Sequence, residues 1–193
     1  MEDYETEENN ESVRVLLLGE QETDGLRLVN NYRQYYSDLI SNKLKREGSK
    51  EEIKFFLLDS AKKLILYNPS IFFHKAKVII FVYDITNKKS FKSIKSFWYP
   101  LAKTFWENDP ILAVVGHKQE LYLEAKVRED DGENYAKSIG AFFQEVSSLD
   151  GSGLYSLFTK IGDAYLSKKS REEKEEQYGN YGFGSYCSCF WLN

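Results

Sequence analysis

The 193-residue chain has few of the residues that staple small domains or hold metals. It contains two cysteines and two histidines, and both cysteines, Cys187 and Cys189, fall within the last seven residues. A disulfide framework and a zinc site are therefore excluded. No apolar run approaches the roughly 18 to 20 residues of a membrane span, and the acidic start is the opposite of a signal or transit peptide. We expect an intracellular, cytoplasmic protein without a metal site.

Excess positive charge is also lacking, because 30 acidic residues face 26 basic ones and give a net charge of −4. The acid excess is local, since residues 1–12 hold six carboxylates and no base, whereas residues 13–193 carry 24 acids and 26 bases. A nearly neutral body gives no reason to expect nucleic-acid binding. We therefore divide the chain into an acidic N-terminal tail (1–12), a domain (13–167), and a charged, then glycine- and aromatic-rich, C-terminal tail (168–193).

The domain alternates apolar strands with helices. Buried strands are predicted at residues 13–19, 53–58, 78–83, 111–115 and 141–146, with a further strand in a hairpin over 42–58 that turns at 47–49. Helices are predicted at residues 25–38, 90–106, 129–139 and 153–167, the second kinked at Pro100, and the charged stretch after 167 extends the last one. Strands without a polar stripe favour a doubly wound α/β fold: a mostly parallel six-stranded sheet with helices on both faces.

Several segments resemble Rab-type small GTPases of the Ras superfamily. Residues 15–19 with 28–32 look like the first strand, phosphate loop and first helix of that family, and residues 56–61 look like the strand that ends in Asp-Thr-Ala-Gly. Residues 76–91 are close to the Rab pattern around the fourth strand, and residues 114–121 and 143–148 sit where the Asn-Lys-x-Asp-Leu and Ser-Ala-Lys motifs belong. The resemblance spans about residues 13–167 and implies a Ras-like, P-loop NTPase fold.

The phosphate loop departs most from the family pattern Gly-x-x-x-x-Gly-Lys-[Ser/Thr], in which the lysine binds phosphates and the hydroxyl binds Mg²⁺. Gly19 matches the first glycine, but Asp24, Gly25 and Leu26 stand at the second glycine, the lysine and the hydroxyl residue. The loop also carries three carboxylates, Glu20, Glu22 and Asp24. At ~5 Å and an effective dielectric of ~20, each like-charge pair costs roughly 3 kcal/mol. We expect this loop to repel a nucleotide phosphate, and we interpret Gly19 and Gly25 as a tight strand-to-helix turn.

The switch residues are also changed. Asp59 remains of the second motif, but Lys62 and Lys63 replace the glycine and glutamine that respond to the γ-phosphate, and no threonine lies between Thr23 and Thr86 to bind Mg²⁺. The resemblance would make Asp59 a second-shell Mg²⁺ residue, and the alternative is a cap or tether for the following loop. No residue is therefore assigned a catalytic role.

The base-recognition motif is changed less. His117 replaces its asparagine, Lys118 is kept, and Glu120 replaces the aspartate that would pair with guanine. Ser147 begins the last motif, whose Ala-Lys is replaced. If nucleotide binds at all, the resemblance implies that Gly19, Gly25, Asp59, His117, Lys118, Glu120 and Ser147 surround it. The other interpretation of His117 is a polar residue at a strand end.

Two further groups are candidate contacts. The aromatic stretch 90–106 has apolar residues at helical spacing, which favours core packing, but Trp98, Tyr99 and Trp106 exceed what one core face needs and are candidate partner contacts. Cys187 and Cys189 resemble Rab tails, yet four residues follow Cys189, so neither the Rab nor the Cys-a-a-X prenylation pattern fits. Palmitoylation of these cysteines, or docking of the aromatic tail onto protein, stays open.

The sequence therefore predicts a Rab-like pseudo-GTPase that serves as an interaction or structural subunit beside other proteins, with no cofactor. The alternative is a divergent GTP-binding switch in vesicle traffic, with GTP or GDP and Mg²⁺ as cofactors. A third hypothesis is an adaptor tethered to membranes through the C-terminal tail alone.

Overall fold

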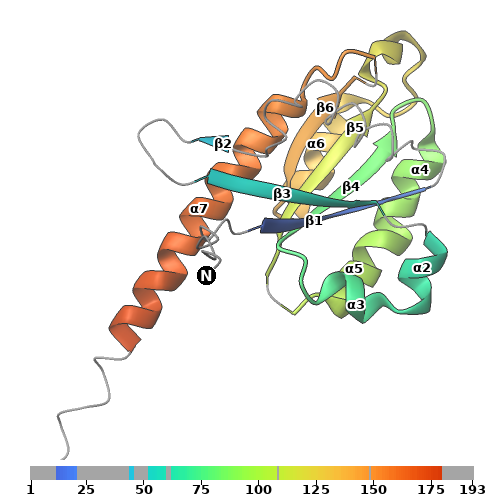
Figure 1. Ribbon diagram of the computed structural model, residues 1–193. Coiled ribbons are helices and arrows are strands. Elements are labelled where there is room, and N and C mark those ends of the chain that lie inside the picture. Colours follow the sequence, from blue (N-terminus) through green and yellow to red (C-terminus); the bar gives the residue numbers. More distant parts are fainter. Residues whose placement is uncertain are drawn as a thin grey trace, which may run out of the picture.

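The computed structural model describes residues 12–20, 44–45, 52–59, 62–107, 109–147 and 149–179. Their strands form one six-stranded sheet in the order β2-β3-β1-β4-β5-β6 (Figure 1). The strands are β1 (Ser12–Gly19), β2 (Leu44–Lys45), β3 (Glu52–Asp59), β4 (Val78–Asp84), β5 (Ile111–His117) and β6 (Phe142–Val146). All neighbours pair in parallel except β2 and β3, which are antiparallel. The predicted fold is confirmed.

The central strands are buried on both faces. All seven residues of β4 and six of the seven in β5 are buried, as apolar strands in a doubly covered parallel sheet should be. In β1 the side chains alternate between two cores: Val15 and Leu17 join one cluster, and Leu16 and Leu18 join the other. Helices on both faces of the sheet therefore follow directly from the lack of a polar stripe.

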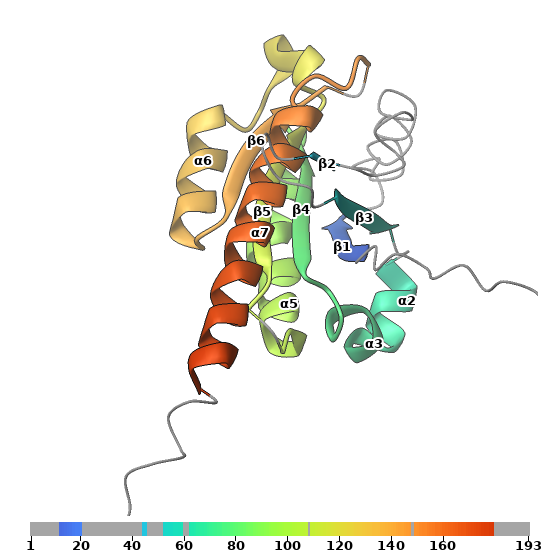
Figure 2. The same cartoon turned by 60° about the vertical axis from the view of Figure 1, so that its left-hand side comes forward.

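One face is covered by α7 (Leu154–Gly179), which crosses β5 and β6 and runs on past the sheet (Figures 1 and 2). Leu157, Phe158 and Ile161 pack into the core on this side, and the buried residues of the helix end at Leu166. Residues 171–176 are exposed, so the charged stretch extends the helix, as predicted, without adding to the core. No helix among the described residues combines the length and apolar character needed to cross a membrane.

The other face carries most of the other helical segments of the described residues. These are α2 (Lys62–Tyr67), α3 (Pro69–Phe73), α4 (Lys88–Ser93), the π-helical turn η2 (Ile94–Trp98), α5 (Tyr99–Phe105) and α6 (Glu129–Ser138). The short helices α2 and α3 were not predicted from the sequence. The predicted aromatic helix is real but is interrupted by η2, one turn before the expected kink at Pro100. Proline lacks an N–H and its ring crowds the carbonyl four residues earlier, at Ser96, so the wider π turn accommodates it.

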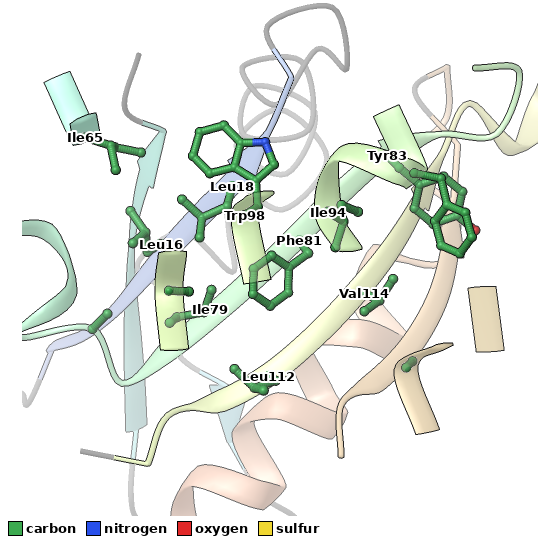
Figure 3. Close-up of a cluster of buried hydrophobic side chains, with 14 of the residues drawn as sticks. Leu16, Leu18, Ile65, Ile79, Phe81, Tyr83, Ile94, Trp98, Leu112 and Val114 are labelled. Atoms are coloured by element: carbon green, nitrogen blue, oxygen red, sulfur yellow. The ribbon is translucent and has the colours of Figure 1, made fainter. Parts of the chain in front are cut away.

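Trp98 is part of the core on this face, and its assignment as a partner contact is wrong. Its side chain is 1% exposed and belongs to the same cluster as Leu18, Phe81 and Ile94 (Figure 3). The spacing of the buried residues, at helix positions three and four apart, turns it inward. Tyr99 and Trp106 are half-buried against this cluster, with ring centroids 6.0 Å apart. A partner contact through their exposed edges stays a prediction.

Several predictions fall on residues outside the described ones. These are the acidic tail up to residue 11, the helix over 25–38 that includes Gly25, and the C-terminal segment with Cys187 and Cys189.

Candidate functional site

The carboxyl ends of the parallel strands gather the candidate residues at one edge of the sheet. Asp84 at the end of β4 is level with His117 at the end of β5, and His117 is level with Val146 at the end of β6. Lys118 and Ser147 directly follow these strand ends. The structure thus brings His117, Lys118 and Ser147 together, as the resemblance implied.

Two other described candidates, Gly19 and Asp59, lie further along the sheet. Gly19 ends β1 beside Val82, and Asp59 ends β3 level with Leu17. Because β1 separates β3 from β4, the backbone of Asp59 lies two strands away from Asp84. Asp59 therefore does not belong to the cluster around Lys118.

An ion pair between Asp84 and Lys118 is the centre of that cluster. Lys118 Nζ donates to Asp84 Oδ2 at 2.7 Å, and the two side chains are 22% and 8% exposed. Asp84 Oδ1 accepts two further hydrogen bonds from Thr86, one from its backbone N–H at 2.8 Å and one from its hydroxyl at 2.7 Å. Both carboxylate oxygens are thus used within the protein.

These contacts set the protonation of Asp84. Burial by itself would raise the pKa of the Asp84 carboxyl, but the hydrogen bonds from Lys118 and Thr86 and the charge of Lys118 outweigh it, so the pKa is lower than usual. The group is therefore ionised at neutral pH. Asp84 was not singled out from the sequence. The signal that could have found it was an aspartate at the end of one buried strand together with a lysine directly after the next strand.

The chain after β4 is held by hydrogen bonds within the protein. The Asp84 N–H donates to Ser90 Oγ at 3.0 Å, and Asn87 Oδ1 accepts from the Lys89 N–H at 3.0 Å, which caps α4. The Ile85 carbonyl accepts from the N–H groups of residues 126 and 127. This loop ties β4, α4 and the chain before α6 together.

The residues of the motif after β5 also have structural roles. His117 is the last residue of β5, at a strand end as predicted, but it is buried, with 0% of its surface exposed, and does not belong to the loop. Lys118 adopts the left-handed conformation, with φ of 69°, and turns the chain into the 3-10 helix η3 (Gln119–Glu124). Glu120 is partly exposed in the first turn of η3.

Ser147 serves the turn between β6 and α7. Its hydroxyl accepts from the Leu149 N–H at 3.1 Å, its N–H donates to the Ser152 carbonyl at 3.1 Å, and the residue is buried. Gly153 closes this turn at φ +84°, where a Cβ would lie 2.3 Å from the Glu145 carbonyl oxygen. Hydrogen bonds from Ser152 lower the pKa of Asp150 in the same turn.

The part of the phosphate-loop segment that is described consists of Gly19 and Glu20. Ser93 Oγ of α4 donates a hydrogen bond to Glu20 Oε1. A carboxylate therefore stands directly after β1. Among the described residues, no group of three or more histidine, cysteine, aspartate or glutamate side chains could hold a metal ion.

The comparisons with known proteins agree with this architecture. The profile of the Ras family matches residues 28–167. The chain belongs to the Ras family. Ras-related protein Rab-26 of Rattus norvegicus is 29% identical over 107 residues, which are 55% of this chain and 41% of that protein.

Longer matches come from Rab-21. Ras-related protein Rab-21 of Bos taurus is 25% identical over 179 residues, or 88% of this chain and 80% of its own, and that of Mus musculus is 24% identical over 184 residues, or 90% and 82%. The chain spans about two fifths of the Rab-26 protein and four fifths of Rab-21. It is thus a Rab-like member of the small GTPase family, and the family match begins after the loop that starts at Gly19.

Proposed function

We propose that this chain is a catalytically inactive Rab-like domain that acts as an interaction or structural subunit of a larger protein assembly. The observation that carries the proposal is the chemistry of the phosphate loop, where Gly25 and Leu26 replace the lysine and the Mg²⁺-binding hydroxyl and three carboxylates stand nearby. The proposal places the protein in the cytoplasm with protein partners, without nucleic acid.

The residues at the positions that would recognise the guanine base support the same conclusion. Lys118, which is unchanged in the motif, is bound to Asp84, and His117 has no exposed surface to offer a ligand. Glu120 is one methylene longer than the aspartate it replaces, which displaces its carboxylate from the guanine edge. A guanine nucleotide with Mg²⁺ does not fit these residues.

Thermal unfolding with nucleotide tests the proposal. A ligand present at about 100 times its Kd stabilises a protein by roughly 2.7 kcal/mol, and for a chain of this size that raises Tm by roughly 5–10 °C. We expect no shift from GTP or GDP with Mg²⁺ at about 1 mM. The matched variant is Asp24→Gly/Gly25→Lys/Leu26→Ser, which restores the loop chemistry. A Mg²⁺-dependent shift in the unaltered protein would contradict the proposal.

The second candidate is a divergent GTP-binding switch in vesicle traffic. The matches to Rab-21 over four fifths of its length and the retained Lys118 favour it. Under this candidate Gly19, Gly25, Asp59, His117, Lys118, Glu120 and Ser147 line the nucleotide, and Arg27 or Lys62 replaces the missing lysine. It predicts the Mg²⁺-dependent shift that the first proposal excludes, and Lys118→Met should abolish that shift.

A further inference from the structure

Three consecutive apolar residues in η3 have no role in the core. Leu121, Tyr122 and Leu123 are 36%, 67% and 84% exposed, and no residue of η3 is buried. A short polar turn could connect β5 to α6 equally well. Adjacent exposed apolar side chains of this kind mark interaction surfaces rather than folding requirements.

The exposed residues continue onto the neighbouring turn. The chain leaves β5 into η3 and leaves β6 into residues 149–153, and the two strands are neighbours in the sheet. Both segments lie side by side at the end of the molecule opposite the C-terminal end of α7 in both views (Figures 1 and 2). Leu149 is exposed on the second segment. We call Leu121, Tyr122, Leu123 and Leu149 the edge patch.

The surroundings of the edge patch are acidic. Residues 119–133 carry six acids and two bases, and the first turn of α6 holds Glu129, Asp130 and Asp131. Burial, and then the nearby charge of Glu129, raises the pKa of Glu145 on β6. A surface with this charge attracts cations and repels acidic peptides and anionic lipid headgroups.

We propose that the edge patch binds a basic amphipathic segment of a partner protein, whose apolar side chains cover Tyr122 and Leu123 and whose lysines or arginines face the acids around α6. Tyrosine in an exposed apolar setting is a frequent anchor of such interfaces. The inference rests on the proposed function and specifies it: the face used is the one where the family would read a base. A second exposed group, Leu66, Tyr67 and Ile71 on α2 and α3, serves as an internal control.

A labelled peptide tests the inference with the full chain. The probe is a fluorescent 16-residue helix of leucine and lysine, with the leucines on one face; the controls are a scrambled peptide and one with glutamate for lysine. Fluorescence anisotropy gives the Kd for each. We expect binding of the amphipathic basic peptide alone. Equal binding of the acidic or the scrambled peptide overturns the inference.

Substitutions then locate the binding site. Tyr122→Ser/Leu123→Ser should weaken binding by about tenfold or more, as loss of an interface anchor does, while Tyr67→Ser/Ile71→Ser should leave it unchanged. Glu124→Lys/Asp130→Lys should weaken binding and reduce its salt dependence. Because the side chains of Tyr122 and Leu123 are mostly exposed, the Tm of the Tyr122→Ser/Leu123→Ser variant should stay the same. Equal loss in both apolar variants, or none in the first, overturns the inference.

Two further outcomes keep the inference separate from the proposed function. Heat of GTP binding in a calorimeter refutes the proposed function and leaves the peptide result standing. No GTP binding together with no peptide binding refutes the inference alone. Sedimentation that shows a dimer dispersed by Tyr122→Ser/Leu123→Ser assigns the patch to a second copy and overturns the basic partner.

Discussion

Replacing Lys118 by methionine should destabilise the fold even though the lysine sits in a ligand-recognition motif. The variant keeps the left-handed backbone and most of the side-chain volume, and removes the charge 2.7 Å from Asp84. At an effective dielectric of ~20 that pair has a gross attraction of about 6 kcal/mol. Desolvation offsets part of it, and breaking buried pairs costs about 3–5 kcal/mol. Because Thr86 still binds Asp84 and Lys118 is partly exposed, we expect a loss of about 2–3 kcal/mol.

Urea unfolding of the unaltered protein, Lys118→Met, Asp84→Asn and the double variant measures this loss. The double variant should recover part of it, with a coupling above about 1 kcal/mol. The lowered pKa of Asp84 sets the pH dependence: its stabilisation is present above the unfolded value, near pH 4, and is lost as the pH falls through the folded pKa. The difference in the free energy of unfolding between Lys118→Met and the unaltered protein should therefore become smaller at acidic pH. A loss below about 0.5 kcal/mol, or additive single effects, would refute the structural role.

Other substitutions test the packing around β4 and β6. Gly132→Ala should cost about 1–3 kcal/mol in urea unfolding despite the better helix propensity of alanine, because the new Cβ would lie 2.5 Å from Tyr83 Oη and 2.6 Å from Phe143 Cε2. Tyr83→Phe should be neutral or stabilising, since that buried hydroxyl has no hydrogen-bond partner among the described residues, and it should offset part of the Gly132→Ala loss; a large loss would contradict this. Glu145→Gln should raise the free energy of unfolding at pH 7, because burial and the charge of Glu129 raise the pKa of Glu145 and thus disfavour its ionised form in the folded protein. That gain should vanish as the pH falls to the unfolded pKa, which unfolding at pH 7 and pH 4 would check.

The fold could be predicted from the sequence because the patterns that indicate it are local and recur along the chain. Apolar runs without polar stripes required a covered parallel sheet, and the helical spacing of the aromatic residues turned them toward the core. Long-range geometry was harder to predict. The π turn before Pro100 depends on how the helix accommodates the clash between the proline ring and the Ser96 carbonyl, and this does not follow from the spacing of apolar residues.

The candidate site was predicted in place but not in detail. The resemblance to Rab-type GTPases implied that His117, Lys118 and Ser147 would lie near one another. It did not tell us that Asp84 would bind Lys118, because the register between β4 and β5 is set by packing along the whole strands. The motif residues also have structural tasks here, as the buried His117 and the turn around Ser147 show, so the presence of a motif residue alone does not indicate a ligand.

The nucleotide content of the purified protein tests the central claim most directly. The full chain would be purified quickly in Mg²⁺-containing buffer, denatured, and its released nucleotides separated by ion-exchange chromatography and quantified against protein. We predict no guanine nucleotide, because the loop after Gly19 offers carboxylates instead of a lysine and a hydroxyl. One GTP or GDP per chain would contradict the account and establish this Rab-like protein as a nucleotide-binding switch.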